Sequence, residues 1–269
     1  MRSYDIFIKE IDDIRRWLFT TIYAYNKTYE ILSEKIQNGN TVADQVAIAF
    51  NENDCNEMSL ARRLSTDNIK TCKELALIRN ISALEIFTVD SVKEVFNANR
   101  SPFLSNKKIE HAVGELLSCD NISELHNKYI EQKCRNLHND GFEEIQKYYK
   151  KTFDIEFSNF NFKIDETVYG ISFLKQYHQK RHLIVHRMGK TDEQYRKQYN
   201  TNEMTIKLDE NELSTFFEVL RVFALFLERK VSQYIMTPPI DNVIEIVVEI
   251  MYESALEQLE PTFEIRKKE

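Results

Sequence analysis

The chain has 269 residues, a formal net charge of −7 at pH 7, and 42% hydrophobic and 12% aromatic residues. This length allows one large or two small domains, and the aromatic content supports a large core. With only 5 glycines and 4 prolines, the composition argues against a β-sandwich or a dinucleotide-binding fold and favours long helices. The acidic balance argues against a general polyanion binder.

Cysteine usage and hydropathy indicate the compartment. The cysteines are scattered and form no C-x-x-C pair, so we expect free thiols in a reducing compartment. No apolar run reaches about 18 residues, so no membrane span is expected. The N-terminal segment lacks the apolar stretch of a secretory signal. We therefore expect a cytoplasmic protein.

Hydrophobic residues recur at steps of three to five over most of the chain, which is the spacing of amphipathic helices. No internal repeat and no low-complexity tract interrupts the pattern. The predicted fold class is all-α, a helical bundle with an extra long N-terminal helix and a C-terminal helix. We expect helices over about residues 4–37, 66–97, 106–118, 121–134, 141–152, 165–188, 209–236 and 240–259.

Three segments between these helices have a different character. Residues 39–64 are polar and irregular, which indicates a linker or mobile loop with room for a short helix at 41–50. In residues 153–164, apolar and polar side chains alternate roughly and Phe is frequent, so the segment is either extended or a packed loop. Residues 204–208 have the composition of a short strand.

Two helix ends carry capping signals. Gly189 is in a good position to cap the helix predicted at 165–188, because glycine readily adopts the left-handed conformation. Asp209 with Glu212 three residues later resembles a capping box, although the box proper uses Ser or Thr. Pro238-Pro239 ends the helix that Asp209 begins.

The most informative feature is the run Arg181-His182-Leu183-Ile184-Val185-His186, inside a helix with almost no polar face. Burying Arg and His is costly unless each finds a partner or a task. Arg neutralises phosphate charge with a planar fork of donors. His changes protonation near neutral pH and so can take or give a proton. These are the two side chains needed to cut RNA without a metal.

The spacing of the pair favours a site shared by two chains. Arg181 and His186 are offset by roughly 140° around an ideal helix and by about 7.5 Å along it, so one chain does not easily aim both at one phosphate. Two copies packed antiparallel about a two-fold axis bring two Arg and two His into one cleft, unless a local bulge alters the helix. A His would take the proton of the ribose 2′-OH while Arg stabilises the transition state.

The segment from Lys175 to Tyr199 contains seven basic residues and two acidic ones. A local basic patch on an acidic protein suits contact with a phosphate backbone, although a solvated helix face has the same composition. Tyr195 and Tyr199 either stack on bases or pack at the surface. The candidate RNA-binding residues are Lys180, Arg187, Lys190, Tyr195 and Arg196.

Other titratable residues have plainer interpretations. His178, His182 and His186 stand at i, i+4 and i+8, but no E-x-x-H pattern accompanies them, so we predict no metal site. His178 is expected to be a helix-face histidine with a hydrogen-bond partner. Glu85 and Asp90, on the second long helix, form either a solvent-facing pair or a support for the motif Arg.

The motif matches a known signature. Arg181 and His186 fit the R-x-x-x-x-H pattern of HEPN domains, in which a polar residue such as His182 usually follows the Arg. The surrounding KQYHQKRHLIVHRMGKTDEQYRKQY resembles the motif helix and trailing loop of prokaryotic HEPN ribonucleases. The resemblance implies that Arg181 and His186 are catalytic and that His182 helps to orient the site.

Upstream segments extend the resemblance to about residues 66–235. NISALEIFTVDSVKEVF resembles an earlier core helix of these proteins, and EEIQKYYKKTFDIEF resembles the piece before the motif helix. We therefore divide the chain into an N-terminal helix and linker, a HEPN-like helical domain, and a C-terminal helix and tail, at 1–64, 65–237 and 238–269.

The resemblance implies a dimeric, metal-independent ribonuclease that needs no cofactor and acts in a toxin–antitoxin, abortive-infection or other antiviral system. The implied partners are RNA (tRNA or mRNA), a second copy of the chain, and an antitoxin, sensor or activator protein, with no membrane. Some HEPN toxins carry a Tyr two residues after the motif His that an antitoxin modifies with nucleotides. Met188 stands there, which argues against that route of silencing. The alternatives are a non-catalytic HEPN-like scaffold and a helical metalloprotein.

Overall fold

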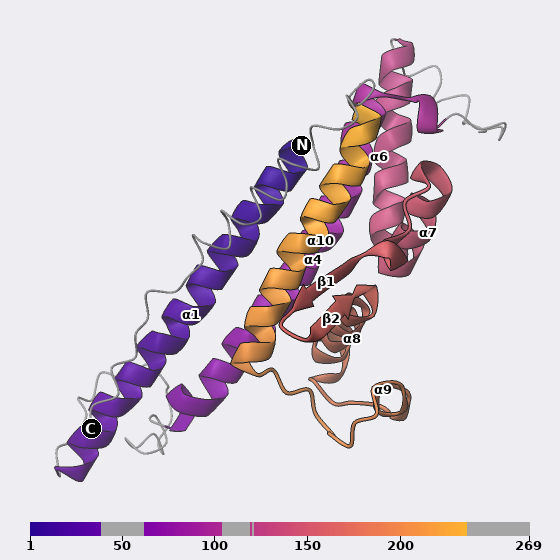
Figure 1. Ribbon diagram of the computed structural model, residues 1–269. Coiled ribbons are helices and arrows are strands. Elements are labelled where there is room, and N and C mark those ends of the chain that lie inside the picture. Colours follow the sequence, from indigo (N-terminus) through magenta and orange to yellow (C-terminus); the bar gives the residue numbers. More distant parts are fainter. Residues whose placement is uncertain (39–61, 104–118, 120, 236–269) are drawn as a thin grey trace. The chain divides into compact units, whose positions relative to one another are not determined.

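The structure is a computed structural model that describes residues 1–38, 62–103, 119 and 121–235. Helices dominate this part of the chain, which confirms the predicted all-α class (Figure 1). A π-helical turn, Arg63–Asn68, leads directly into the second long helix. The α-helices are α1 (Arg2–Gln37), α4 (Ile69–Ala98), α6 (Ile122–Asp140), α7 (Phe142–Phe153), α8 (Ile171–Arg187), α9 (Glu193–Gln198) and α10 (Glu210–Ile235).

The described residues belong to one compact unit. The helices expected at 106–118 and 240–259, and the short helix at 41–50, lie outside the described residues. Among the described helices, none combines the length and apolar character needed to cross a bilayer.

The N-terminal helix α1 shares its core with α4 and α10. Its buried positions recur every three or four residues, so one apolar stripe faces the neighbouring helices. Phe7 stacks on Phe87 of α4 with ring centroids 4.8 Å apart and 12° between the ring planes. Arg15 pairs with Glu218 of α10 at 2.7 Å. The stripe consists of Phe7, Ile11, Ile14, Leu18 and Ile22.

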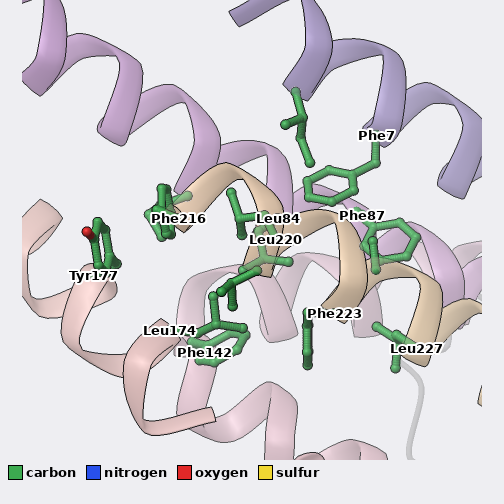
Figure 2. Close-up of a cluster of buried hydrophobic side chains, with 14 of the residues drawn as sticks. Phe7, Leu84, Phe87, Phe142, Leu174, Tyr177, Phe216, Leu220, Phe223 and Leu227 are labelled. Atoms are coloured by element: carbon green, nitrogen blue, oxygen red, sulfur yellow. The ribbon is translucent and has the colours of Figure 1, made fainter. Parts of the chain in front are cut away.

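The central core forms around α10, where side chains from α1, α4, α7, α8 and α10 converge (Figure 2). Phe216 of α10 stacks on Tyr177 of α8, with ring centroids 4.1 Å apart and planes 6° apart. Farther along α10, Phe223 meets the edge of Phe157 at 5.2 Å. Aromatic pairs of this kind stabilise beyond their buried area, so α8 is held firmly against α10 through its own aromatic residues.

The segment before α8 shows that the motif helix begins later than predicted. A 3-10 turn at Phe157–Asn159 is followed by β1 (Asn161–Ile164), which pairs antiparallel with β2 (Thr167–Gly170). Residues 153–164 are therefore partly extended, and the motif helix begins at Ile171 rather than near 165. At Gly170 an added Cβ would lie 3.3 Å from the Phe160 carbonyl oxygen, so the hairpin favours glycine where it enters α8.

The end of α8 and the segment after α9 differ in detail from expectation, whereas the start of α10 agrees with it. The first left-handed residue after α8 is Met188 (φ 52°), with Gly189 (φ 76°) following and donating its N–H to the Leu183 carbonyl. Asp209 caps α10, because its Oδ1 accepts from the backbone N–H groups of Asn211 and Glu212. Residues 204–208 form no strand, only a single bridge between Thr205 and Lys190.

Candidate functional site

All six motif residues lie on α8, which is α-helical without interruption from Ile171 to Arg187. The regular geometry preserves the offset between Arg181 and His186, roughly 140° around the axis and about 7.5 Å along it. The buried face of α8 contacts α4 and carries Leu174, Tyr177, Lys180, Leu183 and Ile184. Arg181 therefore lies at the edge of the buried face, while His186 is exposed to solvent.

The two motif histidines are neighbours on the exposed side of α8. His182 and His186 are one turn apart, and their ring centroids lie 4.7 Å from each other with 46° between the planes. Both side chains are exposed. One helix thus presents two imidazoles together at the surface, in a position to exchange protons with a bound molecule.

Arg181 is half-buried and unpaired. Its Nε atom is buried and has no hydrogen-bond partner, and the side chain forms no ion pair within the described part of the chain. The nearby carboxylate that feels its charge is Glu85 of α4. A guanidinium that is partly buried and has no committed anion is available to bind one.

Three of the candidate RNA-binding residues are engaged elsewhere in the protein. Lys180 is buried and its ammonium pairs with Glu212 of α10. Arg187 pairs with Asp192 at 2.7 Å. Arg196 donates to the Thr191 carbonyl at 3.0 Å. These contacts connect α8 to α10 and shape the loop around α9, so we leave Lys180 out of the proposed RNA contact.

The remaining two candidates differ in accessibility. Tyr195 is buried, and its ring lies against Tyr199 with centroids 4.8 Å apart. Burial raises the pKa of Tyr195 to about 12. Its ring is part of the core rather than a platform for a base. Lys190 is exposed, and its side chain has no charged partner among the described residues, so it is the freest cation of the set.

Sequence reasoning left the role of Glu85 open, and the structure places it against α8. The side chains of Glu85 and His178 are 15% and 13% exposed, with Oε1 and Nδ1 3.6 Å apart. The His178 ring stacks on Phe142 of α7, with centroids 4.1 Å apart and planes 17° apart. Asp90 is exposed. Glu85 and Asp90 therefore have different surroundings, and Glu85 is the one that lies against the motif helix.

Burial and charge set the ionisation of this pair. Burial lowers the pKa of His178 although Glu85 acts in the opposite direction. Burial alone would raise the pKa of Glu85, but His178, Arg181 and His138 outweigh it and leave that pKa lowered. At neutral pH the site therefore holds a neutral imidazole beside an ionised carboxylate.

The histidine ladder does not converge on one point. His178 is turned towards Glu85 and Phe142, whereas His182 and His186 are exposed. Within the described residues, no group of three His, Cys, Asp or Glu side chains is arranged to hold a metal ion. This arrangement gives the metalloprotein alternative no support.

Comparisons with known proteins give no assignment. No protein-family model matches the chain, and no curated protein or solved structure matches it. The feature that indicates a function is the chemistry of α8, which carries an uncommitted guanidinium and two exposed imidazoles on adjacent turns.

Proposed function

We propose that the protein is a metal-independent endoribonuclease of the HEPN type, which acts as a homodimer in a toxin or antiphage defence system. The observation that supports this most directly is the state of Arg181. Neighbouring Lys180 and Arg187 are paired with carboxylates, whereas Arg181 has no anion partner among the described residues. A phosphate would supply that partner. The substrate class we propose is tRNA or mRNA in the cytoplasm.

The proposed reaction uses the groups of α8 in separate roles. His186 takes the proton of the ribose 2′-OH, and the oxygen attacks the adjacent phosphorus. Arg181 stabilises the extra negative charge of the transition state. The protonated His186 of the second protomer gives a proton to the leaving 5′-oxygen, and His182 orients the site. The products are a 2′,3′-cyclic phosphate and a 5′-hydroxyl, and DNA is not a substrate because it lacks the 2′-OH.

The surface around the motif is compatible with a two-fold contact. Val185 and Met188 are 45% and 86% exposed, and both are apolar residues next to the exposed histidines. Packing two α8 helices against each other would bury these side chains, which is favourable. The same contact would bring each exposed imidazole towards the other copy's guanidinium.

A cleavage assay tests the proposal. The purified protein is incubated with tRNA or total RNA in EDTA, and product ends are identified as 2′,3′-cyclic phosphates. We expect Arg181→Ala and His186→Ala to abolish cleavage and to leave the dimer intact. Ser172→Ala, at an exposed position of the same helix, should cleave like the wild type. Cleavage that persists in both motif variants would remove the catalytic assignment.

Cells provide the corresponding test of biological role. Expression of the wild-type chain is expected to stop growth, and His186→Ala is expected to restore it. This comparison tests toxicity and catalysis together, because the variant changes one exposed side chain and leaves the core unchanged.

One observation favours a second function, a non-catalytic HEPN-like dimer that scaffolds a larger complex. Lys180, Arg187, Tyr195 and Arg196 are all engaged within the protein, which leaves few free side chains for RNA. A stable dimer that neither cleaves nor binds RNA, alone or with its partner protein, would favour the scaffold.

A further inference from the structure

Among the described residues, three buried side-chain atoms on α7 and α8 have no hydrogen-bond partner: His178 Nε2, Arg181 Nε and Gln146 Nε2. His178 and Arg181 are three residues apart on one helix, so their Cβ atoms are neighbours. Gln146 lies four residues after Phe142 on α7, so the two share one face of that helix, and Phe142 stacks on His178. Leaving such groups unpaired costs about 1–3 kcal/mol each.

The three atoms are chemically complementary once the tautomer of His178 is assigned. Nδ1 faces the ionised carboxylate of Glu85 at 3.6 Å, and the negative charge there favours the tautomer in which Nδ1 carries the proton. Nε2 is then an acceptor. Arg181 Nε and Gln146 Nε2 are donors. One water molecule that donates to His178 and accepts from the other two would make about three hydrogen bonds, the usual number for a buried water.

We propose that His178 is a positioning residue for Arg181, which it holds through a bridging water shared with Gln146, and that Glu85 fixes the tautomer this requires. The guanidinium is thereby anchored at Nε, and its two terminal nitrogens remain free for phosphate. This inference rests on the proposed function in one respect, that Arg181 is the residue that binds the phosphate.

Exchange of the Arg181 Nε–H proton with solvent reports on the anchor directly. Protein labelled with 15N-arginine gives this signal, which is assigned by its loss in Arg181→Lys. In the wild type we expect slow exchange. In His178→Phe, which keeps the stack on Phe142 but removes Nε2, exchange is expected to be at least about tenfold faster. The control is Ser172→Ala, an exposed position on the same helix, which should leave exchange unchanged.

Gln146→Leu provides the second variant, because it removes the other donor with little change in volume. Exchange at Arg181 should accelerate there as well. Circular dichroism confirms that each variant is folded. Unchanged Arg181 exchange in both His178→Phe and Gln146→Leu would overturn the inference.

Kinetics separate this inference from the proposed ribonuclease activity. We expect His178→Phe to lower kcat about tenfold with KM little changed, because a disordered guanidinium weakens transition-state contacts. In the Arg181→Ala background the same change should have no further effect. If the wild-type protein cleaves no RNA, the proposed function fails. The exchange experiment still decides whether His178 anchors Arg181.

Discussion

The ammonium of Lys180 on α8 binds the carboxylate of Glu212 in the first turn of α10, and only 7% of the Lys180 side chain is exposed. It also lies 4.5 Å from the ring centroid of Tyr177, whose hydroxyl donates to the Glu212 backbone oxygen at 3.3 Å. Acidic groups are favoured at a helix N-terminus. Lys180 therefore connects the motif helix to α10, although its charge alone suggested a contact with RNA.

Replacing Lys180 should lower stability rather than RNA affinity. Lys180→Ala removes a charged hydrogen bond and a cation–π contact, so the free energy of unfolding should fall by about 1.5–3 kcal/mol. Lys190→Ala is the matched control. Its ammonium is exposed, so stability should change by no more than about 0.5 kcal/mol. Urea unfolding measures the first effect.

The RNA contact of Lys190 should appear in the salt dependence of binding. If Lys190 neutralises one phosphate, Lys190→Ala lowers the slope of log K against log[salt] by about 0.7–0.9. Lys180→Ala should leave that slope unchanged, because its ammonium belongs to the α8–α10 contact. Titration of catalytically inactive protein with RNA at several salt concentrations distinguishes the two. A lower slope in Lys180→Ala together with an unchanged slope in Lys190→Ala would show that Lys180, and not Lys190, contacts the RNA.

A shared site predicts complementation between two inactive chains. Arg181→Ala and His186→Ala, carried on separately tagged chains, are co-expressed and the heterodimer is purified through both tags. Its cleft still contains one guanidinium and one imidazole, so cleavage should reappear above that of either inactive homodimer, but below the wild-type rate because the second imidazole, which protonates the leaving 5′-oxygen, is missing. A heterodimer as inactive as the two homodimers would contradict a shared site in which one imidazole suffices as the base.

Long-range periodicity predicts most of this fold. The helix expected at 4–37 spans 2–37, and the one expected at 66–97 corresponds to α4 with its preceding π-helical turn. These helices are long, so the apolar spacing repeats over many turns and single exceptions do not obscure it. The start of α8 was wrong because Val168 and Tyr169, which belong to β2, also fit the apolar pattern of a helix.

The sequence could not show which partners the basic side chains bind in the folded protein. Seven basic residues between 175 and 199 predicted a patch, but Glu143, Glu212 and the Thr191 carbonyl meet three of them. The carboxylates of Glu143 and Glu212 come from other helices, so only the fold brings them close. Glu85 was ambiguous for the same reason. Its place beside His178 depends on how α4 packs against α8.

The end of α8 offers a stabilising substitution. Met188 adopts φ 52° and is 86% exposed, and a left-handed conformation costs a residue with a Cβ about 1–2 kcal/mol. Met188→Gly removes that cost but makes the unfolded chain freer. The net gain in unfolding free energy should be about 0.5–1 kcal/mol, measured by urea unfolding. Gly189→Ala is the reciprocal variant and should destabilise, because φ is 76° there.

The acid sensitivity of the fold should depend on His178. Burial lowers the pKa of His178 in the folded protein below its ordinary value of 6.5. At a pH between the folded pKa and 6.5, the unfolded chain therefore binds more protons than the folded one. Stability from this group is complete above about pH 6.5 and is lost as pH falls towards the folded pKa. Glu85, whose pKa is also lowered, acts in the same direction but below its ordinary value of 4.5.

His178→Phe isolates this contribution. Phe preserves the stack on Phe142 and cannot titrate, so the loss of unfolding free energy between about pH 7.5 and about pH 5 should be smaller than in the wild type. Ser172→Ala serves as the comparison, because that exposed side chain does not titrate in this range and should leave the pH profile close to the wild-type one. Urea unfolding at a series of pH values gives the three curves. Parallel curves for the wild type and His178→Phe would show that the buried imidazole remains equally protonated in the folded and unfolded chains.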